Sequence, residues 1–297
     1  MKTRAAFTMI ELIFVIVVMG IIGKFGVEFL AQAYKSFIFS NVNNALHSKS
    51  ASAVEFIATR LQYRIKDSLI ARTDDTNITA VGIGSADSST GTNYTVLEWI
   101  SMDIDGYRGT TTPNWSGIAD LDPGQAAGGL IVSPSTETNT TSALIDTLSY
   151  GAKDINDTAL YFIGSNSDIS TGYGWSGVLA DQSGAMHPIN STATITQFTP
   201  SVGTFTGVDI YEYYKLAWTA YAIVNRDADG DGDDDLILYY DYQPWNGDTL
   251  ANARQAVLMN DVATFQFTAI GSIIKIQVCA NSDLVEDYSL CKEKTVF

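Results

Sequence analysis

The chain has 297 residues, enough for one large folded domain or two small ones. It carries 33 Asp and Glu against 17 Lys and Arg, so its surface repels the phosphate backbone of nucleic acids, and we expect the folded domain to bind none. Two histidines and two cysteines leave little material for His-rich metal sites or nucleophilic catalysis.

A short basic segment, residues 1–6 (MKTRAA), precedes an apolar run from Phe7 to Gly23. The run is close to the lower length limit for a membrane-spanning helix. Positive charge before it predicts a cytoplasmic N-terminus. A secretory signal peptide would be cleaved after the run, but here the predicted helix continues into an amphipathic segment. We therefore expect the apolar segment to remain in the protein as a single-pass anchor, with the rest of the chain outside the cytoplasm.

Glu11 lies within this apolar run. A carboxylate among lipid tails costs about 2.5–3.5 kcal/mol on the insertion scale, so it needs a partner. If the chain is cut after Ala6, Phe7 becomes the N-terminus, and Glu11 lies one helical turn from the new ammonium group. That amine could belong to the same chain or to a neighbouring subunit. The alternative is an ordinary signal anchor that contains an accidental glutamate.

The basic leader, the small Ala6 and the sequence F-T-x-x-E-L followed by an apolar helix resemble the prepilin signature of type IV pilins and type II secretion pseudopilins. The resemblance covers about the first tenth of the chain. It implies cleavage by a prepilin peptidase between Ala6 and Phe7, N-methylation of Phe7 and a role for Glu11 in subunit assembly. Two positions depart from the family: Ala6 stands where glycine is usual, and Glu28 where many major pilins have proline.

Apolar residues continue at helical spacing beyond the membrane segment, and no proline occurs before Pro113. We expect one helix with a transmembrane part over residues 7–29 and an amphipathic part over residues 30–72. The amphipathic part should pack on the sheet of an extracytoplasmic head, residues 73–297.

Within the head, short strand-like runs alternate with Gly, Ser, Thr, Asn and Asp clusters, which is typical of antiparallel β structure. The predicted fold is therefore α+β, with the long N-terminal helix packed on an antiparallel sheet, as in pilins. A loop-rich insertion is expected over residues 103–192, and a short helix near Thr249–Leu258. His187 is expected in a loop. The predicted strands are Thr95–Met102, Gly129–Val132, Ala159–Ile163, Ala193–Phe198, Leu216–Val224, Leu236–Tyr242, Val262–Ala269 and Ile273–Cys279.

An acidic segment, RDADGDGDDDL from Arg226 to Leu236, lies between two predicted strands. Carboxylates so close together repel one another, and Ca²⁺ removes that repulsion because it accepts six to eight oxygen ligands. The spacing is similar to calcium loops that join strands in β-propeller repeats. It resembles an EF-hand loop in its first half only, since Leu238 stands at the position of the bidentate Glu. The predicted structural Ca²⁺ site consists of Asp227, Asp229 and Asp231 through their side chains, Asp233 through its carbonyl and Asp235 as the closing carboxylate.

Two alternatives to this calcium site remain: a solvated acidic turn without an ion, and Mg²⁺, which prefers stricter octahedral geometry and retained water. A second register that begins at Asp229 is less favourable because Asp234 would then occupy the sharp turn that Gly232 suits.

Cys279 and Cys291 form a pair that closes a short loop near the C-terminus. In an oxidising compartment such a pair predicts a disulfide, which stabilises a loop of this size by about 3 kcal/mol. In the cytoplasm the same residues would be two free thiols.

No catalytic motif is present, and we expect no enzymatic activity. Three functions fit the sequence: a minor pseudopilin at or near the tip of a type II secretion pseudopilus in the periplasm, a minor pilin of a type IV pilus or DNA-uptake machine, and an adhesin-like head on a pilin stem. The expected partners are the prepilin peptidase, other pilin or pseudopilin subunits and the inner membrane. The run from Asn260 to Phe267 weakly resembles a late segment of J-type minor pseudopilins, which favours the first.

Overall fold

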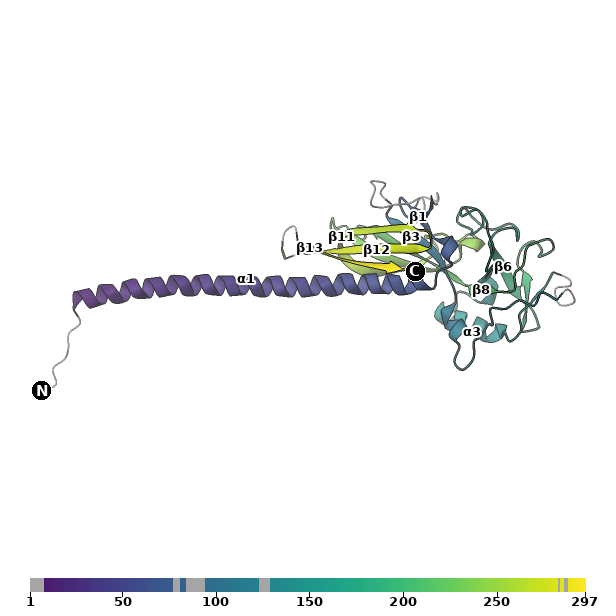
Figure 1. Ribbon diagram of the computed structural model, residues 1–297, viewed down its shortest axis with the longest axis horizontal. Helices are drawn as coiled ribbons and strands as arrows, with labels where there is room; N and C mark the ends of the chain where they lie inside the picture. The colour runs from purple at the N-terminus through teal and green to yellow at the C-terminus, as the bar shows by residue number, and fades with distance from the viewer. Residues whose placement is uncertain (1–7, 77–80, 84–93, 123–128, 283, 286–287) are drawn as a thin grey trace.

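The computed structural model describes residues 8–76, 81–83, 94–122, 129–282, 284–285 and 288–297. The chain forms an elongated molecule in which a long helix carries a β-rich head at its C-terminal end (Figure 1). This is an α+β architecture with antiparallel sheets, as the sequence predicts.

Helix α1 (Met9–Gln62) is 54 residues long and runs without a break from the apolar N-terminal segment into the head (Figure 1). Proline, which would break it, is absent from this range. Its first part is exposed, whereas one side of the later turns is buried. The buried residues recur every three or four positions, as expected for a helix with one face on a core: Val42, Leu46, Ser50, Ala53, Val54, Ile57, Ala58 and Leu61.

The helix ends at Gln62, ten residues before the end predicted at residue 72. The chain leaves the helix because its backbone pairs with a strand: Ile65 N–H donates to the Ile100 carbonyl at 2.9 Å, and Met102 N–H donates to the Tyr63 carbonyl at 2.9 Å. Ile65 is buried although it lies beyond the helix. An apolar residue at this position therefore extends the helical pattern in the sequence past the end of α1 at Gln62.

The larger sheet has eight antiparallel strands in the order β13-β12-β11-β10-β9-β3-β1-β2. Helix α1 lies along one face, chiefly against β13 and β12. The strands are β1 (Ile70–Arg72), β2 (Val81–Gly82), β3 (Val96–Ser101), β9 (Thr219–Arg226), β10 (Asp234–Tyr242), β11 (Arg254–Ile270), β12 (Ile273–Asn281) and β13 (Ser289–Val296).

A second antiparallel sheet has five strands in the order β4-β7-β6-β5-β8. Its strands are β4 (Ile131–Val132), β5 (Ala159–Phe162), β6 (Met186–Ser191), β7 (Gln197–Pro200) and β8 (Tyr214–Ala217). The other helices are α2 (Ile104–Arg108), α3 (Thr138–Leu148) and short 3₁₀ turns at Lys66–Ser68, Ile155–Asp157 and Pro244–Asn246.

Alternation along the strands divides the head into layers. Leu97 and Trp99 of β3 belong to the core shared with α1, whereas Val96 and Ile100 face the opposite side. That second core joins the larger sheet to the smaller one, and Tyr161 of β5 belongs to it. A third core, which includes Leu160, Phe162 and Phe198, covers the far side of the smaller sheet.

Several segments differ from the sequence expectations. The helix predicted near Thr249–Leu258 is wrong, because Arg254–Ile270 is one strand of 17 residues. The insertion over residues 103–192 contains α2, α3 and strands of the second sheet. His187 was expected in a loop, but it lies in β6 and is 1% exposed. Strand β13 was missed because charged residues, Lys292, Glu293 and Lys294, fall on both of its sides and interrupt any apolar alternation.

Candidate functional site

The N-terminal end of α1 carries the carboxylate predicted to guide assembly. Thr8 precedes the first helical residue, and both its backbone N–H and its hydroxyl donate to Glu11 Oε2, at 3.0 and 2.9 Å. The Glu11 carboxylate therefore points back toward the N-terminal end of the helix. The predicted cleavage residues, Ala6 and Phe7, lie outside the described residues.

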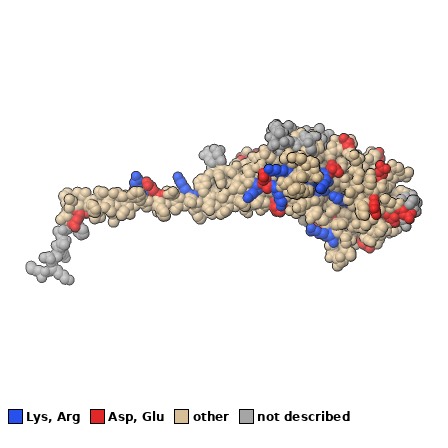
Figure 2. All heavy atoms as spheres, viewed as in Figure 1, with Lys and Arg blue, Asp and Glu red and all other residues tan. Residues whose placement is uncertain are grey.

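The exposed part of α1 is apolar around its whole circumference. Between Met9 and Asn41 it has four charged residues, Glu11, Lys24, Glu28 and Lys35, and Figure 2 shows correspondingly few charged atoms along it. Lys24 and Glu28 pair with each other at 3.8 Å, one turn apart. The helix is long and apolar enough to cross a membrane.

The acidic loop joins β9 to β10 as a hairpin connection. Carboxylate oxygens of Asp227, Asp229 and Asp231 lie within 4.8 Å of one another, and all three residues are exposed. The loop turns back on itself through Gly230 and Gly232, whose φ angles are +83° and +102°, values that favour glycine. Asp227 accepts hydrogen bonds from both glycine N–H groups, at 2.7 and 3.2 Å.

The other two predicted ligands stand apart from this group of three. Asp235 is 4% exposed and accepts from the Ala228 N–H at 3.4 Å. Burial raises the pKa of Asp235, and the negative charges of Asp229, Asp231 and Asp227 raise it further. The Asp233 side chain accepts from the Asn281 amide at 3.4 Å. The loop thus gathers uncompensated negative charge at one end of the larger sheet.

Cys279 and Cys291 form a disulfide. They face each other in register on β12 and β13. The bond therefore ties the edge strand β13, which packs on α1, to its neighbour. The predicted pairing is confirmed.

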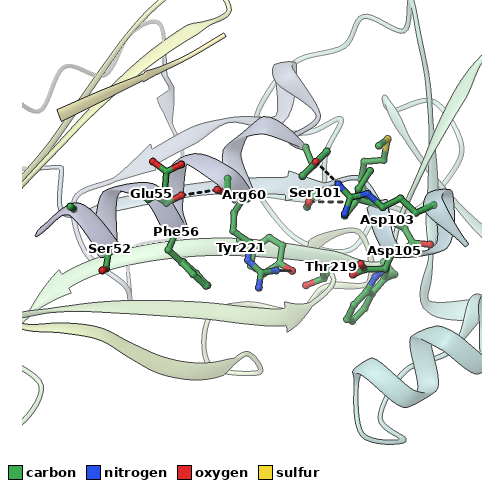
Figure 3. A pocket seen from close by; sticks show the side chains of 16 residues that line it. Ser52, Glu55, Phe56, Arg60, Ser101, Asp103, Asp105, Thr219 and Tyr221 are labelled. Carbon is green, nitrogen blue, oxygen red and sulfur yellow. Dashed lines mark hydrogen bonds between the residues drawn. The ribbon is translucent and has the colours of Figure 1, made fainter. Parts of the chain in front are cut away.

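A cavity of about 760 Å³, which we call the Arg60 cavity, lies between the last turns of α1 and the ends of β3 and β9 (Figure 3). Arg60 lies against two aromatic rings there, 5.0 Å from the Phe56 centroid and 4.9 Å from that of Tyr221, and donates to the Tyr221 hydroxyl at 2.6 Å. Asp103, also on the wall, accepts from Gly106 N–H and Trp115 Nε1, both at 3.0 Å. Burial raises the pKa of Asp103 to about 6.

Sequence reasoning missed this cavity, because its walls come from segments far apart in the chain. The only local signal is the four-residue spacing of Phe56 and Arg60 on one helix. The cavity is lined by two basic residues, Arg60 and Arg108, and by three acidic residues, Glu55, Asp103 and Asp105, so charges of both signs occur in it.

Comparisons of the chain with models of protein families, with curated proteins and with solved structures found no match.

Proposed function

We propose that the chain is a pilin-like filament subunit: a minor pseudopilin that assembles at or near the tip of a type II secretion pseudopilus. The observation that carries the proposal is a single carboxylate, Glu11, at the start of an exposed apolar helix that continues unbroken into an antiparallel head. In lipid that charge is costly unless a positive group neutralises it, and the Thr8 contacts that cap the helix supply none. No catalytic activity is proposed.

The geometry at the helix start supports processing after Ala6. Glu11 Oε2 lies 3.0 Å from the backbone nitrogen of Thr8, the residue next to Phe7. A new ammonium group on Phe7 would therefore form close to the Glu11 carboxylate. Alternatively, Glu11 would exchange its contacts with Thr8 for a contact with a neighbouring subunit. The exposed apolar surface from Met9 to Asn41 then packs first in lipid and later against other helices of the filament.

Mass spectrometry of the chain expressed with a prepilin peptidase tests the processing step. We expect the mature chain to lack residues 1–6 and to begin with N-methylated Phe7. The Glu11→Ala variant should still be cleaved but enter sheared filaments at least ten-fold less, because its charge pair is lost. Glu28→Ala is the matched control, since Glu28 pairs with Lys24 of its own helix, and it should assemble normally. A mature chain that starts at Met1 or beyond Gly23, or normal assembly of Glu11→Ala, would contradict the proposal.

The size of the head favours a rare, tip-located subunit, because a second five-stranded sheet extends beyond the one that packs on α1 (Figure 1). Such bulk would crowd the lateral contacts of a repeating lattice. The same bulk suits a minor pilin of a type IV pilus or a DNA-uptake machine. A deletion strain separates these functions: loss of secreted enzymes with intact pili supports secretion, and the reverse supports a pilus.

We also propose that the acidic loop binds a structural Ca²⁺. The convergence of Asp227, Asp229 and Asp231 supports this, because three exposed carboxylates within 4.8 Å repel one another without a cation. Asp233 and Asp235 would complete the set after a small rearrangement of the hairpin.

Thermal unfolding with 1 mM CaCl₂ or with EGTA tests the calcium site (about 1 mM suffices for an extracellular module). A ligand at 100 times its Kd stabilises the folded state by about 2.7 kcal/mol, so Ca²⁺ should raise the Tm by several degrees. Asp229→Asn should abolish the shift, and MgCl₂ should give a smaller one. Asp105→Asn, which removes one exposed charge elsewhere, should keep it. An unchanged Tm of the unsubstituted chain in Ca²⁺ would refute the site.

A further inference from the structure

A groove lined by hydroxyl groups lies in the loops that flank β6, a strand of the smaller sheet. It consists of two adjoining cavities of about 290 and 350 Å³, which share Ser183 and Gly184. The first contains Ser167 and Thr171, and the second contains Ser165 and Asn166. We call these two cavities the hydroxyl groove.

The junction of the two cavities is built from closely packed backbone. A Cβ atom at Gly184 would lie 2.7 Å from the Gly172 carbonyl oxygen, which Ala185 N–H and Met186 N–H also contact at 2.9 and 3.0 Å. Only glycine fits at position 184 without displacing main chain. The shape of the groove is therefore fixed by β6 and its entry segment.

Two residues of the groove wall carry a buried polar atom that has no hydrogen-bond partner within the described part of the chain: Ser167 Oγ and His187 Nε2. The His187 tautomer follows from its neighbour Gln182. The Gln182 amide nitrogen donates to the Pro188 and Val202 carbonyls, both at 2.9 Å, which leaves Oε1 as an acceptor 3.3 Å from His187 Nδ1. Nδ1 therefore carries the proton, and Nε2 is an acceptor that lacks a donor.

The charge of the groove disfavours anionic ligands. No Lys or Arg occurs among the described residues that line it, so anions find no counter-charge. Burial lowers the pKa of His187 to about 4, so this side chain is neutral near pH 7. Asp181 lines the first cavity and Asp209 lines the second. Over the described ranges, the group of three acidic residues that could hold a metal ion is Asp227, Asp229 and Asp231, which lie outside the groove.

Apolar side chains border the groove at one end. Tyr211 lines it, is 38% exposed, and packs on Gly164. Next to it, Ile118, Tyr213 and Ile163 lie on three adjacent backbone segments that hydrogen-bond in register, and they are 41, 53 and 52% exposed. An aromatic ring beside a set of hydroxyl, amide and carboxylate groups matches the two faces of a sugar, whose C–H face is apolar and whose edge carries hydroxyls.

We propose that the hydroxyl groove binds an uncharged saccharide of about two rings, with a ring against Tyr211 and hydroxyls toward Ser165 and Asn166. This site is independent of filament assembly, and its failure would leave the proposal for Glu11 intact.

A glycan array probed with the labelled full-length chain tests the site. The chain is kept in a polyoxyethylene detergent, because maltoside and glucoside detergents are themselves saccharides. We expect neutral glycans to bind, and titration calorimetry with the strongest to show at least ten-fold weaker binding by Tyr211→Ala. Tyr211→Phe keeps the ring and should bind like the unsubstituted chain. Tyr150→Ala, at a tyrosine 80% exposed and absent from the groove, should bind normally.

Asn166→Ala separates binding from folding. Asn166 is an exposed residue of the groove wall, so truncating its side chain should leave the Tm unchanged while it weakens glycan binding several-fold. The proposal is overturned if no glycan binds, if only charged glycans bind, or if Tyr211→Ala and Asn166→Ala both bind like the unsubstituted chain.

Discussion

Replacing Glu98 by alanine is expected to lower the free energy of unfolding of the head by about 3–5 kcal/mol. Glu98 is 1% exposed on β3, and it accepts from Arg72 Nε at 2.6 Å and from the Tyr242 hydroxyl at 2.7 Å. Burial raises the pKa of Glu98, and the Arg72 charge opposes that shift. Arg72 is 8% exposed, so without the Glu98 carboxylate its guanidinium charge stays buried and loses this counter-charge.

Denaturant unfolding followed by tryptophan fluorescence measures this loss, since all five tryptophans lie beyond α1 and report on the head. The exposed pair Lys275–Glu293, at 2.7 Å, is the matched control: Glu293→Ala should cost at most about 1 kcal/mol. Replacing both buried partners, as Arg72→Met with Glu98→Leu, should recover much of the loss, because no buried charge remains. A cost below about 1 kcal/mol for Glu98→Ala would show that water reaches this pair.

The parts of the fold that the sequence predicts are those with a strong local signal. The long apolar helix and strands such as Val96–Ser101 and Ile273–Asn281 show uniform or alternating apolar character, so their positions follow from composition. Helix α3, over Thr138–Leu148, escaped because it is rich in threonine, whose propensity is low for helix and high for strand. Tertiary contacts, chiefly the burial of Ile145, override that preference.

The candidate sites divide in the same way. The acidic loop and the disulfide are contiguous or nearly so in the chain, and the structure brings Asp227, Asp229 and Asp231 together, and Cys279 with Cys291. The Arg60 cavity and the hydroxyl groove are assembled from distant segments, and single polar residues in loops gave no pattern to detect. The end of α1 was misplaced because burial of Ile65 and Leu69 continues at helical spacing while the backbone already pairs with β3.

Replacing Ile57 by alanine is expected to destabilise the head by about 2–5 kcal/mol, the range for removing a large buried aliphatic side chain. Ile57 is fully buried in the core between α1 and the larger sheet. Its loss leaves a cavity where the helix, which links the exposed apolar segment to the head, is held on the sheet. Ile16→Ala removes the same atoms from the same helix at a residue 63% exposed, and should leave the head unchanged.

The contrast between these two variants measures how firmly the head is fixed to its stem. If Ile57→Ala lowers stability and makes the end of α1 sensitive to protease, packing of the buried stripe holds the helix on the sheet, and a pull on the stem is transmitted to the head through that core. If Ile57→Ala behaves like Ile16→Ala, the core contact of Ile57 contributes little to holding the helix on the sheet, and the head owes more of its stability to the sheet hydrogen bonds and to the disulfide between β12 and β13. Because Val42 to Leu61 bury one continuous face and Lys294 of β13 pairs with Glu55 beside it, we expect the first outcome.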